Sequence, residues 1–156
     1  MQKLICMNIK YSIFTELPEG FDSTLKVAGC YCEWEDKILL LKRHPEKHQG
    51  NTWGVPAGKM EENESPRMTV IREVWEEIGL NIDDEGLQSI GQLYCSLPNI
   101  DYIFYMFRKR FAFLPKIDLE LEEHIEENWV TIEEAYKLPL IAGGIEALNY
   151  YKQKRL

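Results

Sequence analysis

The chain has no long hydrophobic run. Nothing in it approaches roughly eighteen consecutive apolar residues, the length that suggests a membrane-spanning helix. The N-terminus contains Lys3 and Lys10 but no extended apolar stretch with a small-residue cleavage site, so a signal peptide is not expected. We therefore predict no membrane partner and a cytoplasmic location.

Metal-binding patterns of cysteine and histidine are also missing. The four cysteines are Cys6, Cys30, Cys32 and Cys95. They form no Cys-x-x-Cys pair, and Cys30 and Cys32 share one face of a predicted strand, so buried free thiols are expected. The three histidines, at 44, 48 and 124, form no ligand cluster in the sequence. His44 and His48 fall in a polar loop, where solvation is expected and phosphate contact is the alternative.

Positive charge is scarce, because 18 Lys and Arg face 26 Asp and Glu, for a net charge of −8. Long nucleic acids require a basic surface, so they are not expected partners. An acidic protein that acts on a phosphate needs local positive charge, and metal ions supply it. The net negative charge therefore fits a small phosphorylated substrate that is bound with metal ions. The length and the absence of repeats or linkers predict a single domain over residues 1–156.

A helix over residues 66–78 is indicated by its end signals. Ser65 is a favourable N-cap, Pro66 suits the first helical position, and Gly79 can adopt the left-handed conformation that ends a helix. The apolar residues expected on its buried side are Met68, Ile71, Val74, Trp75 and Ile78.

Glu73, Glu76 and Glu77 cluster on the opposite side of this helix, near its C-terminal end. Their mutual repulsion costs about 0.2–0.5 kcal/mol per pair. The negative end of the helix dipole adds about 0.3–1 kcal/mol for each nearby anion. A bound divalent cation would make the same cluster favourable. A solvated acidic face is the alternative interpretation.

The surrounding residues decide between these interpretations. Residues 58–80 fit G-x5-E-x7-R-E-U-x-E-E-x-G-U, where U is a bulky aliphatic residue. The positions that satisfy it are Gly58, Glu64, Arg72, Glu73, Val74, Glu76, Glu77, Gly79 and Leu80. This is the signature of the Nudix hydrolase family, which the chain resembles over a specific, extended motif. Many members have glycine where this chain has Ala57, which is tolerable unless the backbone there needs a positive φ.

The resemblance implies metal-dependent hydrolysis of a nucleoside diphosphate linked to a further group X, with Mg²⁺ or Mn²⁺ as cofactor. The expected metal ligands are the backbone carbonyl of Ala57 and the carboxylates of Glu73, Glu76 and Glu77. Arg72 is expected to orient and neutralise these glutamates, and Glu64 is its candidate partner or a solvated loop acid. Lys59 is a candidate phosphate contact, or an exposed lysine without a role.

A second acidic segment, residues 122–129 with the sequence EEHIEENW, resembles the family's Glu-His segment before a Trp-Val strand. Glu123 is the first candidate for a late metal ligand or general base, and Glu126 is the second. The alternatives are an acidic surface loop, or a base among the glutamates of the helix.

The substrate is less well defined. Residues 133–140 and the final helix resemble the branch that cleaves nucleoside triphosphates to NMP and pyrophosphate, and Lys42 and Arg43 are candidate phosphate contacts. The alternatives are a nucleotide sugar, ADP-ribose or a dinucleoside polyphosphate, or an inactive Nudix binding domain. The aromatic residues that could stack on a base, although most are expected in the core, are Tyr31, Trp34, Tyr102, Tyr105 and Phe107.

The expected fold class is α+β. Strands are predicted at residues 24–33, 38–41, 52–56, 88–96, 101–111 and 129–131, and further helices at 132–137 and 144–154. The resemblance implies an α/β/α sandwich with a mixed central sheet. The oligomeric state is not predicted.

Overall fold

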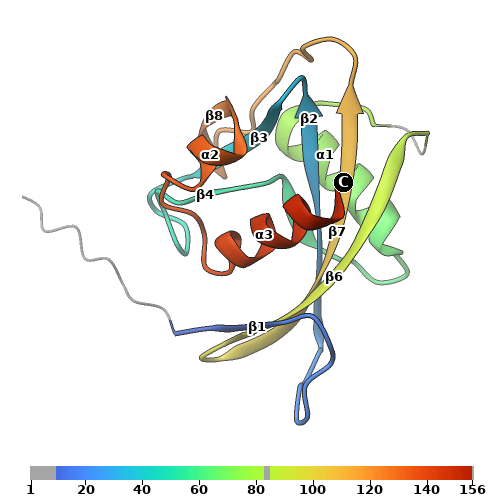
Figure 1. Ribbon diagram of the computed structural model, residues 1–156, viewed down its shortest axis with the longest axis vertical. Helices are drawn as coiled ribbons and strands as arrows, with labels where there is room; N and C mark the ends of the chain where they lie inside the picture. The colour runs from blue at the N-terminus through green and yellow to red at the C-terminus, as the bar shows by residue number, and fades with distance from the viewer. Residues whose placement is uncertain (1–9, 83–84, 156) are drawn as a thin grey trace, which may run out of the picture.

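The computed structural model describes residues 10–82 and 85–155, and Cys6 and Lys3 lie outside them. The elements follow one another from blue to red in Figure 1. The strands are β1 (Ser12–Phe14), β2 (Leu25–Trp34), β3 (Lys37–Arg43), β4 (Trp53–Gly54), β5 (Ala57–Lys59), β6 (Leu87–Leu97), β7 (Ile100–Phe111) and β8 (His124–Val130). The helices are α1 (Pro66–Ile78), α2 (Ile132–Ala135) and α3 (Gly144–Lys154).

The sheet is mixed, and one edge of its middle strand, β2, pairs with two different strands. The strand order is β1-β6-β7-β2-β3-β4, with β5 paired to β2 and β8 to β3. β2 is parallel to β7 along its whole length, but on its other edge it pairs with β5 through residues 27–29 and with β3 only through residues 33–34. The chain between β4 and β5 therefore passes between the two halves of the sheet.

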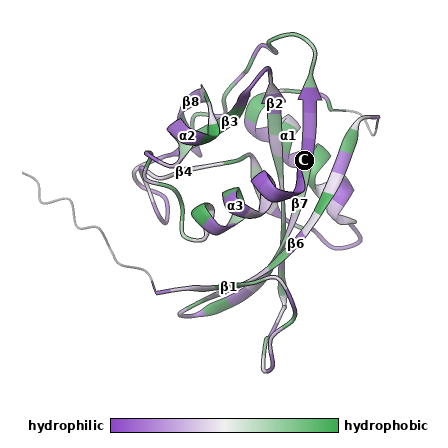
Figure 2. Ribbon diagram, viewed as in Figure 1, coloured by the Kyte–Doolittle hydropathy of each residue, from purple (hydrophilic) through white to green (hydrophobic). Residues whose placement is uncertain are grey.

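Helices cover both faces of this sheet, with α1 on one side and α2 and α3 on the other (Figure 1). Alternation along β2 sends Ala28, Cys30 and Cys32 into the core under α1, and Tyr31 into the core under α3. The helices carry both hydrophobic and hydrophilic residues (Figure 2), as expected for elements with one buried side. The structure confirms the predicted α+β sandwich with a mixed central sheet.

The end signals of α1 act as predicted. The Ser65 side chain accepts a hydrogen bond from the Met68 N–H at 3.1 Å, Pro66 opens the helix, and Gly79 ends it with φ of 69°. The prediction of its buried side is partly wrong. Val74 and Ile78 are buried, but Met68 and Trp75 are 54% and 59% exposed.

The physical reason is the phase of the helix against the sheet. The buried stripe contains Val70, Val74 and Ile78. At about 100° per residue, Met68 and Trp75 lie about 160° and 140° from Val70 and face outward. The same phase brings Glu77 into the buried stripe, so the acidic cluster of α1 faces partly inward.

Other boundaries differ modestly from prediction. The strand expected at 52–56 is shortened to β4, because Pro56 lacks an N–H for the ladder, and β5 after it was not predicted. β8 begins at His124 rather than 129, α2 ends at Ala135, and the short edge strand β1 was not predicted. Cys30, Cys32 and Cys95 are buried and free, as predicted. In the described residues no helix is long and apolar enough to cross a membrane.

Candidate active site

The C-terminal half of α1 holds the three glutamates in different surroundings. Glu77 is 4% exposed, and its carboxylate accepts a hydrogen bond from the Ala57 N–H at 3.0 Å. The Glu73 side chain is largely buried, whereas that of Glu76 is 54% exposed. Ala57 lies in β5 without a positive φ, so alanine is unstrained there. The three carboxylates therefore point along one side of the helix but differ in access to water.

Gly58 makes room for one of these carboxylates. A Cβ built on Gly58 would overlap the carboxylate of Glu73. The glycine at this position is therefore explained by the close approach of a side chain to the backbone of β5.

Arg72 connects α1 to the loop that precedes it. Its Nε and Nη2 donate to the two carboxylate oxygens of Glu64, each at 2.9 Å. Its Nη1 donates to Glu73 at 2.7 Å and to Glu76 at 3.1 Å, and Nη2 also donates to the Lys59 carbonyl at 3.0 Å. The predicted Glu64–Arg72 pair is thus confirmed. The Arg72 guanidinium holds the pKa of Glu64 down, at about 2.

Burial has the opposite effect on the two inward glutamates. It raises the pKa of Glu73, although Arg72 partly offsets this effect. The pKa of Glu77 is raised well above its ordinary value, chiefly by burial and next by the Glu73 carboxylate. Arg72 pairs with Glu73, so Glu77 is the carboxylate that a cation would relieve most, since buried charged groups are normally paired or coordinate metals.

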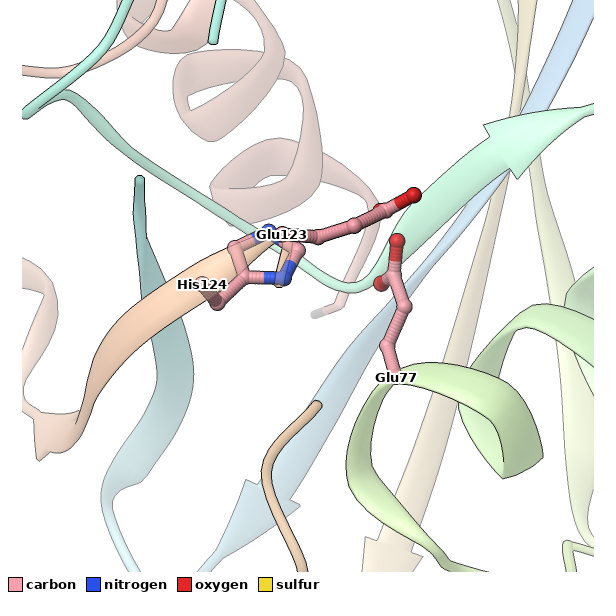
Figure 3. Close-up of side chains that lie close together, drawn as sticks. All are labelled: Glu77, Glu123 and His124. Carbon is pink, nitrogen blue, oxygen red and sulfur yellow. The ribbon is translucent and has the colours of Figure 1, made fainter. Parts of the chain in front are cut away.

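The N-terminal end of β8 brings Glu123 and His124 close to Glu77 of α1. Ligand atoms of Glu77, Glu123 and His124 lie within 4.8 Å of one another, and their side chains converge in Figure 3. The pairing of β3 with β8 places His124 beside Arg43. His124 is 5% exposed, and within residues 10–82 and 85–155 its Nδ1 has no hydrogen-bond partner. Burial, with a contribution from Arg43, lowers the pKa of His124 to about 4.

Sequence reasoning selected Glu123 but missed His124. The available signal was the position of this histidine directly after Glu123 in the Glu-His segment. Glu126 is not part of the cluster, because it lies across from Lys42, 3.9 Å from the Lys42 ammonium. Of the two predicted candidates, only Glu123 lies beside the glutamates of α1.

The three predicted phosphate contacts, Lys42, Arg43 and Lys59, lie in different surroundings. Arg43 lies at the cluster, and its Nε donates to the His48 carbonyl at 2.8 Å. Lys42 lies near the Trp53 ring, 6.0 Å from its centre, as well as near Glu126. The Lys59 side chain is exposed. His48 is exposed, as predicted, and His44 accepts a hydrogen bond from the Glu46 N–H at 3.2 Å.

An apolar pocket with a cavity volume of about 140 Å³, open to solvent, lies next to the carboxylates. Arg43, Ala57 and His124 line it where it meets the cluster, and its apolar walls include Tyr31, Trp53, Tyr102, Phe104, Leu140 and Leu148. Of the aromatic residues expected to stack on a base, Tyr31 and Tyr102 line this pocket, while Tyr105 and Phe107 pack under α1.

One wall of the pocket is fixed by a contact between two loops. The side-chain oxygen of Gln49 accepts a hydrogen bond from the Ala142 N–H at 2.7 Å. Residues 140–144, which carry that N–H, line the pocket. A flat apolar group fits such a space, and an attached anionic group would lie beside the cluster.

The donors at the mouth of the pocket suit a divalent cation. Carboxylate oxygens are the preferred ligands of hard cations, and a cation would relieve the inward charges of Glu73 and Glu77.

The comparison with known families agrees with this arrangement. Residues 24–150 match the NUDIX domain. The chain belongs to the Nudix hydrolase family. Members of this family generally use divalent metals, and the acidic cluster here is a candidate site for one.

Individual relatives differ in what they act on. The chain is 36% identical over 55 residues to an 8-oxo-dGTP diphosphatase from Proteus vulgaris, covering 35% of this chain and 49% of that protein. It is 27% identical over 136 residues to a dihydroneopterin triphosphate diphosphatase from Haemophilus influenzae, covering 78% and 82%. An ADP-ribose pyrophosphatase from Bacillus subtilis is 32% identical over 106 residues, covering 67% and 56%. The matches thus span about half the length of the first and third relatives.

A solved structure supports the fold. The MutT protein from Methanosarcina mazei superposes with a TM-score of 0.69 at 26% identity, covering 84% of this chain and 92% of that one. The fold and the family are therefore established together.

Proposed function

We propose that this protein is a divalent-metal-dependent pyrophosphohydrolase, and that its substrate is a nucleoside triphosphate cleaved to NMP and pyrophosphate. The observation that carries the proposal is the contact between the acidic cluster and the apolar pocket. Ala57 lines the pocket and donates to the Glu77 carboxylate, so a base in the pocket would place its phosphates beside the glutamates.

The donor set fits Mg²⁺ or Mn²⁺. Glu73, Glu76 and Glu77, with Glu123 and the Ala57 carbonyl, are the residues proposed to hold the cation. When bound, such an ion neutralises phosphate oxygens and lowers the pKa of a coordinated water. Burial supports this assignment, since it raises the pKa of Glu77 well above its ordinary value and Arg43 offsets this only in part.

Arg72 acts in this proposal as a positioning residue. Its guanidinium is held by both oxygens of Glu64 and by the Lys59 carbonyl, so it presents Nη1 to Glu73 in a fixed direction. Arg43, at the pocket mouth, and Lys59, at the end of β5, are proposed to contact substrate phosphates.

Glu123 is proposed to take the proton from the attacking water. It is exposed and lies on the β8 side of the site, opposite α1. A carboxylate in this position can approach a water from the side that the glutamates of α1 leave open. The alternatives are Glu126, or a base among the glutamates of α1.

Two of the relatives support a triphosphate substrate, because the Proteus and Haemophilus proteins are named for one. The Bacillus relative is named for ADP-ribose, so ADP-ribose, a nucleotide sugar or a dinucleoside polyphosphate is the second candidate class. A Nudix binding domain without activity is the remaining alternative, but every fixed position of the motif at residues 58–80 is intact.

A substrate panel tests the proposal. The purified protein is incubated with Mg²⁺ and each of the common and oxidised nucleoside triphosphates, ADP-ribose, a sugar nucleotide and a dinucleoside polyphosphate, and the products are separated. We expect NMP and pyrophosphate from a triphosphate, with the highest kcat/KM in the panel. Faster cleavage of ADP-ribose would select the second class, and no product from any substrate would favour a binding domain.

A further inference from the structure

The cluster formed by Glu77, Glu123 and His124 contains a nitrogen donor that the motif at residues 58–80 does not supply. One atom from each side chain lies within 4.8 Å of the others (Figure 3). His124 is 5% exposed and Glu77 is 4% exposed, so two of the three groups are held by the fold. The third, Glu123, is exposed and can adjust its side chain.

His124 has no structural role that explains its imidazole. Its Nδ1 is buried and has no hydrogen-bond partner among the described residues. Buried polar atoms are normally paired, and an unpaired one destabilises a fold by about 1–3 kcal/mol. An aromatic hydrocarbon would pack in this position without that penalty. The unpaired nitrogen is therefore better explained by a ligand than by packing.

The neighbours of the ring also suit a metal. The two carboxylates beside it supply the negative charge that a divalent cation needs.

We propose that His124 is a metal ligand, and that Glu77, Glu123 and His124 together bind a first-row transition-metal ion in preference to Mg²⁺. The inference deepens the proposed function, and it rests on that function only for the role of the metal in catalysis. Imidazole nitrogen suits ions such as Zn²⁺ and Co²⁺, whereas Mg²⁺ takes oxygen ligands almost exclusively. Mn²⁺ accepts both kinds of donor and is the ion shared with the proposed function.

The spacing requires only a small adjustment. Two donors at about 2.1 Å from one ion are at most roughly 4.2 Å apart. The 4.8 Å limit of the cluster exceeds this by about 0.6 Å, so a small movement of the side chains brings all three donors within reach of one ion.

The first experiment needs no substitution. The wild-type protein is labelled with ¹⁵N-histidine, and the ring nitrogens are observed by NMR during titration with Zn²⁺ and, separately, with Mg²⁺. We expect a ring nitrogen of His124 to shift with Zn²⁺ at one equivalent but not with Mg²⁺, while His44 and His48 stay unchanged at that ratio. A His124 signal that ignores Zn²⁺, or that responds equally to both ions, would overturn the proposal.

A matched pair of variants gives a second readout. His124→Phe keeps a ring but removes both nitrogens, and His48→Phe is the control, because His48 is exposed and outside the cluster. We expect His124→Phe to weaken Mn²⁺ binding by about tenfold or more and Mg²⁺ binding by less than about twofold, measured by calorimetry. His48→Phe should bind both ions as the wild type does. Unchanged Mn²⁺ affinity in folded His124→Phe would contradict the proposal, and if that variant does not fold, the NMR titration decides.

The two proposals fail in different ways. If hydrolysis with Mg²⁺ is found but His124 does not respond to Zn²⁺ or Mn²⁺, the proposed function stands and the nitrogen ligand is wrong. If His124 binds the ion but no nucleotide is cleaved with any metal, the metal site stands and the proposed function is wrong.

Discussion

Arg72 and Glu64 form a two-point ion pair, in which Nε and Nη2 of the guanidinium each lie 2.9 Å from a carboxylate oxygen. A fork-to-fork pair of this kind fixes direction as well as distance. Because the Glu64 side chain is only 12% exposed, the pair is partly shielded from solvent. Arg72 is thereby held where Nη1 meets Glu73 at 2.7 Å.

This pair predicts a specific dependence of stability on pH. The pKa of Glu64 is about 2 in the folded protein, against an ordinary value of 4.5. A lowered pKa means that the pair contributes its full stability above about pH 4.5 and loses it progressively as the pH falls toward 2. Glu64→Gln should therefore lower Tm at neutral pH, and the difference from wild type should shrink below pH 4.5. A Tm difference that is constant from pH 7 to 3 would contradict this explanation.

Gly58→Ala tests the close approach of Glu73 to β5. The added Cβ would overlap the Glu73 carboxylate, so we expect that side chain to be displaced. The predicted result is a fall in kcat of up to about 10²-fold, the effect of a small misplacement of a catalytic group, with a circular dichroism spectrum like that of the wild type. Gly20→Ala is a useful control for glycine loss, since nothing lies within 4 Å of a Cβ there, although its φ of 76° will lower Tm somewhat. Wild-type kcat in Gly58→Ala would remove the proposed role of this contact.

The glutamates of α1 should affect stability in the absence of metal. Glu76→Gln should leave the metal-free protein as stable as wild type or slightly more stable, because it removes an exposed charge from the negative end of the helix. Glu77→Gln should raise the metal-free Tm more, since burial raises the pKa of Glu77 well above its usual range. Both variants should bind the cation more weakly. Scanning calorimetry in excess chelator measures the first effect, and a large fall in Tm would show that the carboxylate is structural.

The late glutamate is tested by two parallel substitutions. Glu123→Gln should lower kcat by about 10²-fold or more, in the range expected for loss of a general base, with KM little changed. Glu126→Gln should have a mild effect, because Glu126 lies with Lys42 outside the cluster. The reverse order would assign the role to Glu126, and two mild variants would return the base to the glutamates of α1.

Local sequence signals predicted the parts of the fold that depend on neighbouring residues. Ser65, Pro66 and Gly79 defined α1. The family resemblance offered the pair between Glu64 and Arg72 as one of two interpretations, and the structure shows that pair. The exposure of Met68 and Trp75 was not predicted, because it depends on the rotation of α1 against the sheet rather than on the helix itself.

Long-range pairing explains what else was missed. His124 enters the site because β8 lies antiparallel to β3 and begins beside Arg43, and a sequence pattern does not specify that register. β1 was missed because three residues carry little signal until they pair with residues 94–96 of β6. The roles of Lys42, Arg43 and Lys59 toward phosphate, and the cytoplasmic location, stay predictions.

The most direct test of the whole account is a ³¹P NMR record of one nucleoside triphosphate, the best substrate of the panel, incubated with the protein. The measurement is made with Mg²⁺, with excess chelator, and after Mg²⁺ or Mn²⁺ is restored. We predict NMP and pyrophosphate only when the metal is present, with full recovery on its return, because the inward carboxylates of α1 cannot hold a polyphosphate unaided. Undiminished hydrolysis in excess chelator would contradict the proposed function of this site.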